Sequence, residues 1–148
     1  MAGAGARIRA LESRRAVGTY VIDTNVFDAL SADDALLERA RRLCAAGVVR
    51  FETSQVQERE LGLLRDADRG RHRRADRIPR FVVAAVEGPG GGGRHERDAR
   101  IAATARRDGH TLVTDDAALR EHAATVGVEA WDSARLIAAL ARADTPGG

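Results

Sequence analysis

Short apolar runs alternate along the chain with segments in which apolar residues recur every three or four positions. The apolar runs predict five strands, over residues 20–22, 48–52, 81–86, 111–114 and 128–131. The periodic segments predict helices over residues 26–30, 31–46, 96–107, 115–126 and 133–141, and another that follows Ser54. Because strands alternate with helices, we expect an α/β protein with a central, mostly parallel sheet between two layers of helices. The uninterrupted apolar run at 81–86 predicts a strand covered on both faces.

The same pattern predicts one domain with short tails. A chain of 148 residues buries roughly 70% of the surface that its unfolded form exposes, so it needs no disulfide or metal to fold. The domain is expected over residues 20–141, between tails at 1–19 and 142–148. The glycine-rich residues 87–93 are expected to form a flexible loop, because they cannot hold regular structure.

The composition narrows the chemistry. All 24 basic residues are arginine, so P-loop phosphate binding and Schiff-base catalysis, which both need a lysine amine, are excluded. The net charge of +2 and the isoelectric point near 9.4 are compatible with a nucleic-acid partner. The single cysteine, Cys44, lies on an apolar helical stripe and is expected to act as a small buried hydrophobe. Without a disulfide framework, a membrane-spanning run or a signal peptide, we expect a cytoplasmic protein.

Asp23 stands at the end of the first predicted strand and is followed directly by Thr24 and Asn25. In open α/β sheets, binding sites lie outside the carboxyl ends of the strands, so the position suits a functional carboxylate. Asp, Thr and Asn are also preferred as helix N-caps, so helix capping alone explains these residues equally well.

Three further carboxylates occupy positions that suit a shared site. Glu60 and Asp98 each lie on the apolar stripe of a predicted helix, where an unpaired charge is costly to bury. The alternatives are an arginine partner for Glu60 and an interaction of Asp98 with the helix dipole. Asp115 and Asp116 follow the predicted strand 111–114, and one of the two is expected to cap the next helix.

These carboxylates would repel one another at one edge of the sheet unless a cation lay between them. Oxygen ligands of this kind suit Mg²⁺ or Mn²⁺, which keep several waters and contact few carboxylates directly. With a phosphate ester as substrate, such a centre activates water and stabilises charge on the leaving oxygen. The sequence therefore predicts a metal site formed by Asp23, Glu60, Asp98 and either Asp116 or Asp115.

The segments around these carboxylates resemble a known family. They are Val21-Ile22-Asp23-Thr24-Asn25-Val26-Phe27, Glu58-Arg59-Glu60-Leu61, Asp98-Ala99-Arg100-Ile101-Ala102-Ala103 and Leu112-Val113-Thr114-Asp115-Asp116. Their order and spacing are similar to those of the PIN-domain ribonucleases, and above all to the bacterial VapC-like toxins. The resemblance extends over roughly residues 20–141.

The resemblance implies a PIN-like fold and a Mg²⁺- or Mn²⁺-dependent ribonuclease that hydrolyses RNA. It also implies a homodimer that a cognate antitoxin protein holds inactive. Asn25 would orient the Asp23 carboxylate, and Thr114 would hydrogen-bond a metal ligand or the attacking water. The acidic metal site would consist of Asp23, Glu60, Asp98 and Asp116.

Arginines are dense over residues 59–80 and recur at Arg94, Arg97 and Arg100. They are expected either to contact phosphates, which gives affinity without sequence choice, or to form a solvated helical face. Three other side chains have no predicted catalytic role: His72 and His95 are expected at the surface, and Trp131 in the core or at an interface.

Two other functions are consistent with this layout. One is a PIN-like module that binds RNA or protein without turnover, although all four acidic positions are filled. The other is a phosphatase or response receiver with Asp23 as the nucleophile, which the absence of lysine argues against.

Overall fold

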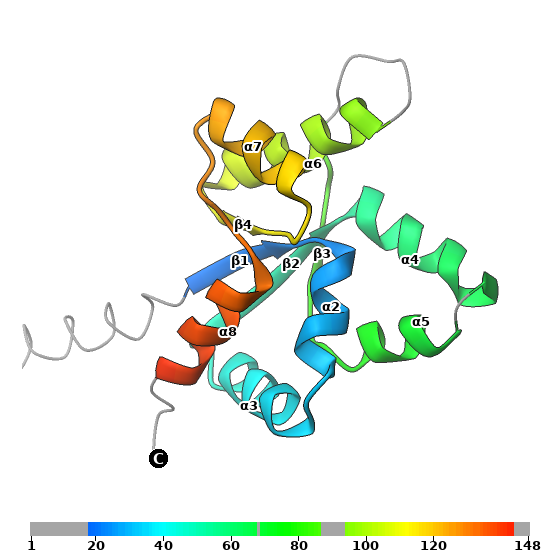
Figure 1. Ribbon diagram of the computed structural model, residues 1–148, viewed down its shortest axis with the longest axis vertical. Helices are drawn as coiled ribbons and strands as arrows, with labels where there is room; N and C mark the ends of the chain where they lie inside the picture. The colour runs from blue at the N-terminus through cyan, green and yellow to red at the C-terminus, as the bar shows by residue number, and fades with distance from the viewer. Residues whose placement is uncertain (1–17, 68, 87–93, 144–148) are drawn as a thin grey trace, which may run out of the picture.

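A five-stranded parallel sheet forms the centre of the computed structural model, which describes residues 18–67, 69–86 and 94–143 (Figure 1). The strands are β1 (Gly18–Ile22), β2 (Val49–Ser54), β3 (Phe81–Val83), β4 (Thr111–Val113) and β5 (Ala130–Trp131). The helices are α2 (Thr24–Ser31), α3 (Asp34–Ala45), α4 (Gln55–Ala67), α5 (Arg69–Asp76), α6 (Arg94–Asp108), α7 (Ala117–Thr125) and α8 (Ser133–Arg142). Every strand pair is parallel, so the predicted α/β fold with helices around a central sheet is confirmed.

The strand order β3-β2-β1-β4-β5 reverses at β1. The chain adds β2 and β3 on one side of β1, then crosses back to add β4 and β5 on the other. Such a reversal opens a crevice outside the carboxyl ends of the two central strands, here β1 and β4. Asp23 follows β1 and Thr114 follows β4, and Asp23 N donates to Val113 O at 2.9 Å. The topology therefore brings these two polar residues to the same crevice.

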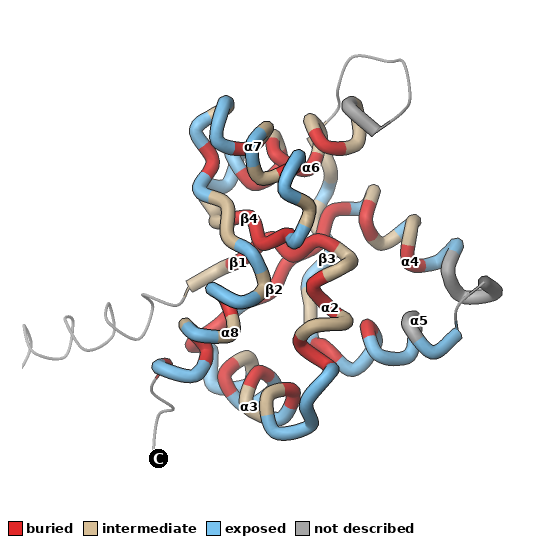
Figure 2. The backbone as a smooth tube through the Cα atoms, viewed as in Figure 1, coloured by how far each residue is buried: buried red, intermediate tan, exposed pale blue. Residues whose placement is uncertain are grey.

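Alternate residues of the central strands point into two apolar layers, as expected for a sheet covered on both faces. Tyr20, Ile22 and Phe51 pack with residues of α2, α3 and α8, whereas Val21 and Leu112 pack with residues of α6 and α7. The buried positions follow the central strands and the helix faces turned towards them (Figure 2). In the described part of the chain, no helix has the length and apolar character needed to cross a membrane.

A capping box places α4 beside the end of β1. Ser54 N donates to Gln57 Oε1 at 2.8 Å, and Gln57 N donates to Ser54 Oγ at 3.4 Å. The amide of the same buried Gln57 side chain donates to Ile22 O at 2.7 Å. Because Ile22 directly precedes Asp23, this bond fixes the start of α4 next to the candidate site.

The prediction of a strand covered on both faces over 81–86 is wrong. β3 is limited to Phe81–Val83 at the edge of the sheet, and Phe81 and Val82 are 55% and 53% exposed. An apolar run indicates burial only where helices cover both faces of the strand. Here the Arg50 guanidinium lies over the Phe81 ring, 3.9 Å from its centroid, in place of a helix.

The apolar stripe predicted on the helix after Ser54, which places Leu63 on one buried face with Glu60, is also wrong in part. Leu63 is 75% exposed, and within residues 55–63, the part of α4 whose burial is described, the buried residues are Gln57 and Leu61. The capping box explains the difference, because it turns the Gln57 face of the helix towards β1. The predicted flexible loop at 87–93 lies outside the described residues, as do 1–17 and 144–148 of the predicted tails. β1 begins at Gly18, two residues before the predicted strand.

Arg80 links α4 to α5 through Glu58. It contacts both carboxylate oxygens of Glu58 and donates to Ala75 O at 2.7 Å. Burial acts to raise the pKa of Glu58, but hydrogen bonds from Arg80 and Thr53 outweigh it and lower that pKa below its usual value. A carboxyl group whose pKa is lower in the folded than in the unfolded protein stabilises the fold at pH values above its unfolded pKa. This stabilisation is lost as the pH falls through its folded pKa.

We therefore expect Glu58→Gln to reduce the free energy of unfolding by about 1–2 kcal/mol at pH 7 and by less at pH 3. Urea denaturation at both pH values measures the difference. Glu38→Gln, which removes an exposed carboxylate from α3, is the control and should change stability by less than about 0.5 kcal/mol. An equal loss at both pH values for Glu58→Gln would contradict the assigned role of the Arg80 contact.

Candidate functional site

Asp23 is buried at the carboxyl end of β1, where three donors hold its carboxylate. One oxygen accepts a hydrogen bond from Thr24 N at 2.9 Å, which makes Asp23 the N-cap of α2. The other oxygen accepts from Thr114 Oγ1 at 2.7 Å, and Arg97 Nη2 lies 2.9 Å from the first. Asp23 is therefore both a helix cap and a buried carboxylate in a polar cluster. Thr114 is thus hydrogen-bonded to Asp23, the residue that the sequence analysis predicts as a metal ligand.

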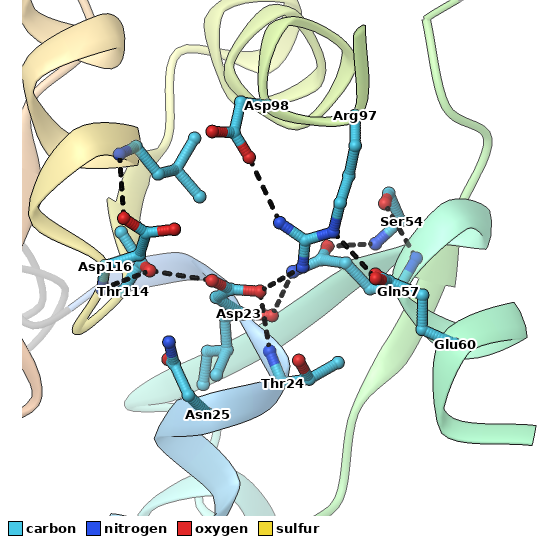
Figure 3. Close-up of polar contacts among 12 residues, drawn as sticks. Asp23, Thr24, Asn25, Ser54, Gln57, Glu60, Arg97, Asp98, Thr114 and Asp116 are labelled. Carbon is cyan, nitrogen blue, oxygen red and sulfur yellow. Dashed lines mark hydrogen bonds and ion pairs between the residues drawn. The ribbon is translucent and has the colours of Figure 1, made fainter. Parts of the chain in front are cut away.

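Glu60 and Asp98 meet Asp23 around the guanidinium of Arg97 (Figure 3). Arg97 Nε lies 2.7 Å from Glu60 Oε2, and Arg97 Nη1 lies 3.2 Å from Asp98 Oδ1. The three carboxylates come from the end of β1, from α4 and from α6. Asp23 and Asp98 are almost completely buried, at 2% and 6% exposure. Three carboxylates distant in sequence thus share one cation at the crevice.

Arg97 is the residue of this cluster whose role the sequence analysis missed. It was expected to contact phosphate or solvent, and it is instead the arginine partner considered as an alternative for Glu60. Burial acts to lower the pKa of Arg97, but the hydrogen bond to Glu60 and the charge of Asp23 outweigh it and raise that pKa. Arg97 therefore stays protonated. Its place next to Asp98 was a weak signal, because adjacent helical residues do not face one another.

The donor set fits a divalent cation by its chemistry. Glu60 Oε1 is buried and makes no hydrogen bond, although a buried carboxylate oxygen normally has a partner. The other oxygen of Glu60 pairs with Arg97, which also pairs with Asp23 and Asp98. All side-chain acceptors of this group are carboxylate oxygens, the ligands that Mg²⁺ and Mn²⁺ favour. A cation bound here would have to displace the Arg97 guanidinium or share the carboxylates with it.

Asp116 and Asp115 occupy different positions after β4. Asp116 caps α7 by accepting from Ala118 N at 3.0 Å, and its own N–H donates to Thr114 Oγ1 at 3.1 Å. Thr114 therefore links Asp116 to Asp23, because its hydroxyl accepts from Asp116 N and donates to Asp23 Oδ2 (Figure 3). Asp115 is exposed, and its Oδ1 accepts from Ser133 N at 2.8 Å at the start of α8. Of the two, Asp116 is attached to the cluster and Asp115 to a neighbouring helix.

Asn25 makes a contact other than the one expected. Its Oδ1 accepts from Asp115 N at 3.3 Å, so it ties the start of α2 to the turn after β4. The carboxylate of Asp23 is oriented by Thr24, Thr114 and Arg97 instead.

The remaining candidates lie away from the cluster or outside the description. Arg100 Nε donates to Val86 O at 3.3 Å, and the side chains of Arg94, His72 and His95 lie outside the described residues. Trp131 packs against Tyr20, with 5.2 Å between the ring centroids, in agreement with a core position. Burial raises the pKa of Cys44 to about 11, which agrees with a small hydrophobe and not with a nucleophile.

Comparison with known proteins supports the fold. No family model and no curated protein matches the sequence. Among solved structures, the chain is similar to a PilT N-terminus (PIN) domain protein from the hyperthermophilic archaeon Sulfolobus solfataricus P2. The match has a TM-score of 0.51 and 17% sequence identity, and it covers 84% of this chain and 94% of that chain. At this identity the likeness concerns the fold alone, and on that ground the chain has a PIN-like α/β fold.

Proposed function

We propose that the protein is a metal-dependent ribonuclease that hydrolyses RNA phosphodiester bonds at the cluster around Asp23, and that it acts as the toxin of a toxin–antitoxin pair. The observation that carries this proposal is the meeting of Asp23, Glu60 and Asp98 at the crevice of a PIN-like fold. Negative charges brought this close together repel one another, so their meeting in a partly buried place suits a function that needs a cation there.

The side chains divide into those that would hold a cation and those that orient them. Asp23, Glu60 and Asp98 would hold a Mg²⁺ or Mn²⁺ ion. Asp116, which Thr114 links to Asp23, would be the fourth acidic residue of the site. When bound, such an ion lowers the pKa of water and stabilises the charge on the leaving oxygen. Thr114 and Thr24 keep the Asp23 carboxylate in one orientation, which lowers the reorganisation needed for the reaction. Arg97 stays charged and, once released from the carboxylates, offers a guanidinium that can pair with a phosphate through two hydrogen bonds.

RNA as the substrate is supported by the charge around this edge. Arg59 is exposed next to Glu60 on α4, and the chain has a net charge of +2 although the cluster itself is acidic. Arginines beside an acidic centre hold the phosphate backbone near the bond to be cleaved, and they make binding depend on salt. Such contacts give no choice of sequence, so the RNA target must be selected by other features.

A cognate antitoxin and a homodimer are part of the same proposal. Leu63, Phe81 and Val82 are large apolar side chains that the described structure leaves more than half exposed. Exposed apolar residues at an edge strand favour association with another chain. Light scattering on the purified protein, alone and after co-expression with the product of any small neighbouring reading frame, would measure the mass of the dimer and of the complex.

We expect the purified protein to cleave a labelled single-stranded RNA in the presence of Mn²⁺ and to lose this activity when the metal is chelated with EDTA. Restoring Mn²⁺ in excess should restore cleavage, and a gel-based assay measures all three states. Cleavage that persists in EDTA would contradict a metal-dependent mechanism. If the protein instead binds RNA or protein without turnover, calorimetry should detect no binding of Mn²⁺, because such a module does not need the ion.

A further inference from the structure

We infer that Glu52, Asp108 and His110 form a second metal site, which binds a transition-metal dication of the zinc class. One ligand atom from each of the three side chains lies within 4.8 Å of the other two. The site is separate from the acidic cluster, because Asp98 and Asp108 stand near opposite ends of α6, about 15 Å apart along the helix axis. It does not depend on the proposed ribonuclease activity.

Three elements bring these side chains together. Glu52 of β2 stands in register with Val21 of β1, so its side chain points to the face of the sheet that α6 covers. Asp108 is the last residue of α6, and His110 follows after Gly109, whose φ of +70° allows the turn into β4. The carboxyl end of a helix carries partial negative charge, which favours a cation at this position.

Two buried atoms without hydrogen bonds point to the ligand. Glu52 Oε1 and His110 Nδ1 are each buried and make no hydrogen bond, yet they lie only 3.2 Å apart. Glu52 as a whole is 4% exposed. Two ligands that bind one ion through bonds of about 2.1 Å lie about 3.0–3.4 Å apart, so the spacing suits an ion bound to both atoms. The alternative, an ion pair between Glu52 and a protonated His110, would normally be joined by a hydrogen bond, and none joins these atoms.

Two arginines pair with the carboxylates of this site. Arg50 Nε donates to Glu52 Oε2 at 2.8 Å, which fixes the carboxylate with Oε1 near His110. Arg107 donates to both oxygens of Asp108, at 3.1 Å and 2.9 Å. The Arg107–Asp108 pair lies near the surface, where solvent screens such pairs strongly. One oxygen of Asp108 can therefore exchange its arginine contact for an ion.

The ligand set selects the class of ion. One imidazole nitrogen with two carboxylate oxygens suits Zn²⁺ and related transition metals, whereas Mg²⁺ favours oxygen ligands alone. Three protein ligands leave a fourth position of a tetrahedral ion for water. The ion would join β2 to the end of α6 and the start of β4, and so stabilise the packing of α6 on the sheet.

Titration calorimetry of the full chain with Zn²⁺ alone tests the site. We expect the wild type to bind one ion here and His110→Ala to bind it at least about 100-fold more weakly, since even the loss of a residue that supports a ligand costs 10–100-fold. His122→Ala, which removes a histidine from α7, is the matched control and should bind as the wild type does. The rise in melting temperature on adding Zn²⁺ should follow the same order, because an ion bound only to the folded state stabilises it.

The acidic cluster serves as the second control. Asp23→Asn should leave zinc binding at this site unchanged, so a failure of the ribonuclease proposal would not affect the result. If His110→Ala does not fold, Asp108→Asn removes an exposed ligand and should weaken binding in the same direction. Absence of zinc binding by the wild type, or binding that His110→Ala and Asp108→Asn both leave intact, would overturn the inference.

Discussion

Asp23→Asn is expected to lower the rate of RNA cleavage in Mn²⁺ by on the order of 10²–10³-fold, the size of effect seen when one electrostatic contact to the reacting charge is lost. The substitution removes the most buried negative charge of the cluster, which is also a charge that pairs with Arg97. Asparagine has nearly the same shape and is as good an N-cap as aspartate. Its amide oxygen can still accept from Thr24 N or Thr114 Oγ1, two of the three donors that now hold Asp23. The loss should therefore arise from weaker metal binding, which calorimetry with Mn²⁺ measures directly.

Asp34→Asn is the matched control for this prediction. Asp34 belongs to the first turn of α3, and its side chain is 94% exposed. It removes the same charge from the chain but not from the cluster, so cleavage and Mn²⁺ affinity should stay at the wild-type level. Circular dichroism should show that both variants are folded. If a folded Asp23→Asn protein cleaves RNA at the wild-type rate, the mechanism proposed for this site is wrong.

The part of the fold that was predictable from the sequence is the part set by local patterns. Apolar runs located all five strands, and the runs in β1 and β4 are uninterrupted because Tyr20–Ile22 and Leu112–Val113 are buried. The polar residue after the first run, Asp23, marked the end of β1, and parallel topology then predicted that Asp23 and the aspartates after the strand 111–114, Asp115 and Asp116, lie at one edge of the sheet. Glu60 and Asp98 were identified as candidates because each charge lies on a predicted apolar helix face, where burying an unpaired charge is costly.

What could not be predicted depends on which surfaces other elements cover. Phe81 and Val82 have the composition of a core strand, but their place at the edge of the sheet follows from the order of all five strands. The buried face of α4 was misassigned because a polar residue, Gln57, points inwards to bond Ile22 O. No apolar periodicity reveals a side chain that is buried for its hydrogen bonds.

The pairing of Arg97 is a second example of the same limit. Twenty-four basic residues, all of them arginine, are available in the chain, and nothing in the spacing distinguishes the one that enters the cluster. Repulsion among the carboxylates predicted a cation at their centre, but it did not say whether the cation would be a metal ion or a guanidinium. In the structure the guanidinium of Arg97 has this role.

Arg97→Met is expected to distinguish the guanidinium from a metal ion, because it should lower protein stability without metal and change it little in saturating Mn²⁺. In EDTA the variant leaves three carboxylates without their shared partner, and we expect a loss of about 2–3 kcal/mol in the free energy of unfolding. This is somewhat less than for a fully buried pair, because the Arg97 side chain is 23% exposed. In saturating Mn²⁺ the loss should largely disappear, because the ion binds the folded state and no longer competes with a guanidinium. Urea denaturation in the two conditions measures both changes.

The competition also predicts tighter metal binding by the variant. In the wild type, Mn²⁺ must displace Arg97 before it binds, so Arg97→Met should bind Mn²⁺ about tenfold or more tightly. The control is Arg106→Met, which changes an exposed arginine on the same helix. It should bind Mn²⁺ as the wild type does. If Arg97 pairs with the RNA phosphate once it is released, cleavage by Arg97→Met should fall although its metal affinity rises, since the loss then lies in the contact to substrate and not in the ion. If Mn²⁺ stabilises wild type and Arg97→Met equally, the guanidinium and the ion do not share the carboxylates, and the centre proposed here does not bind a metal.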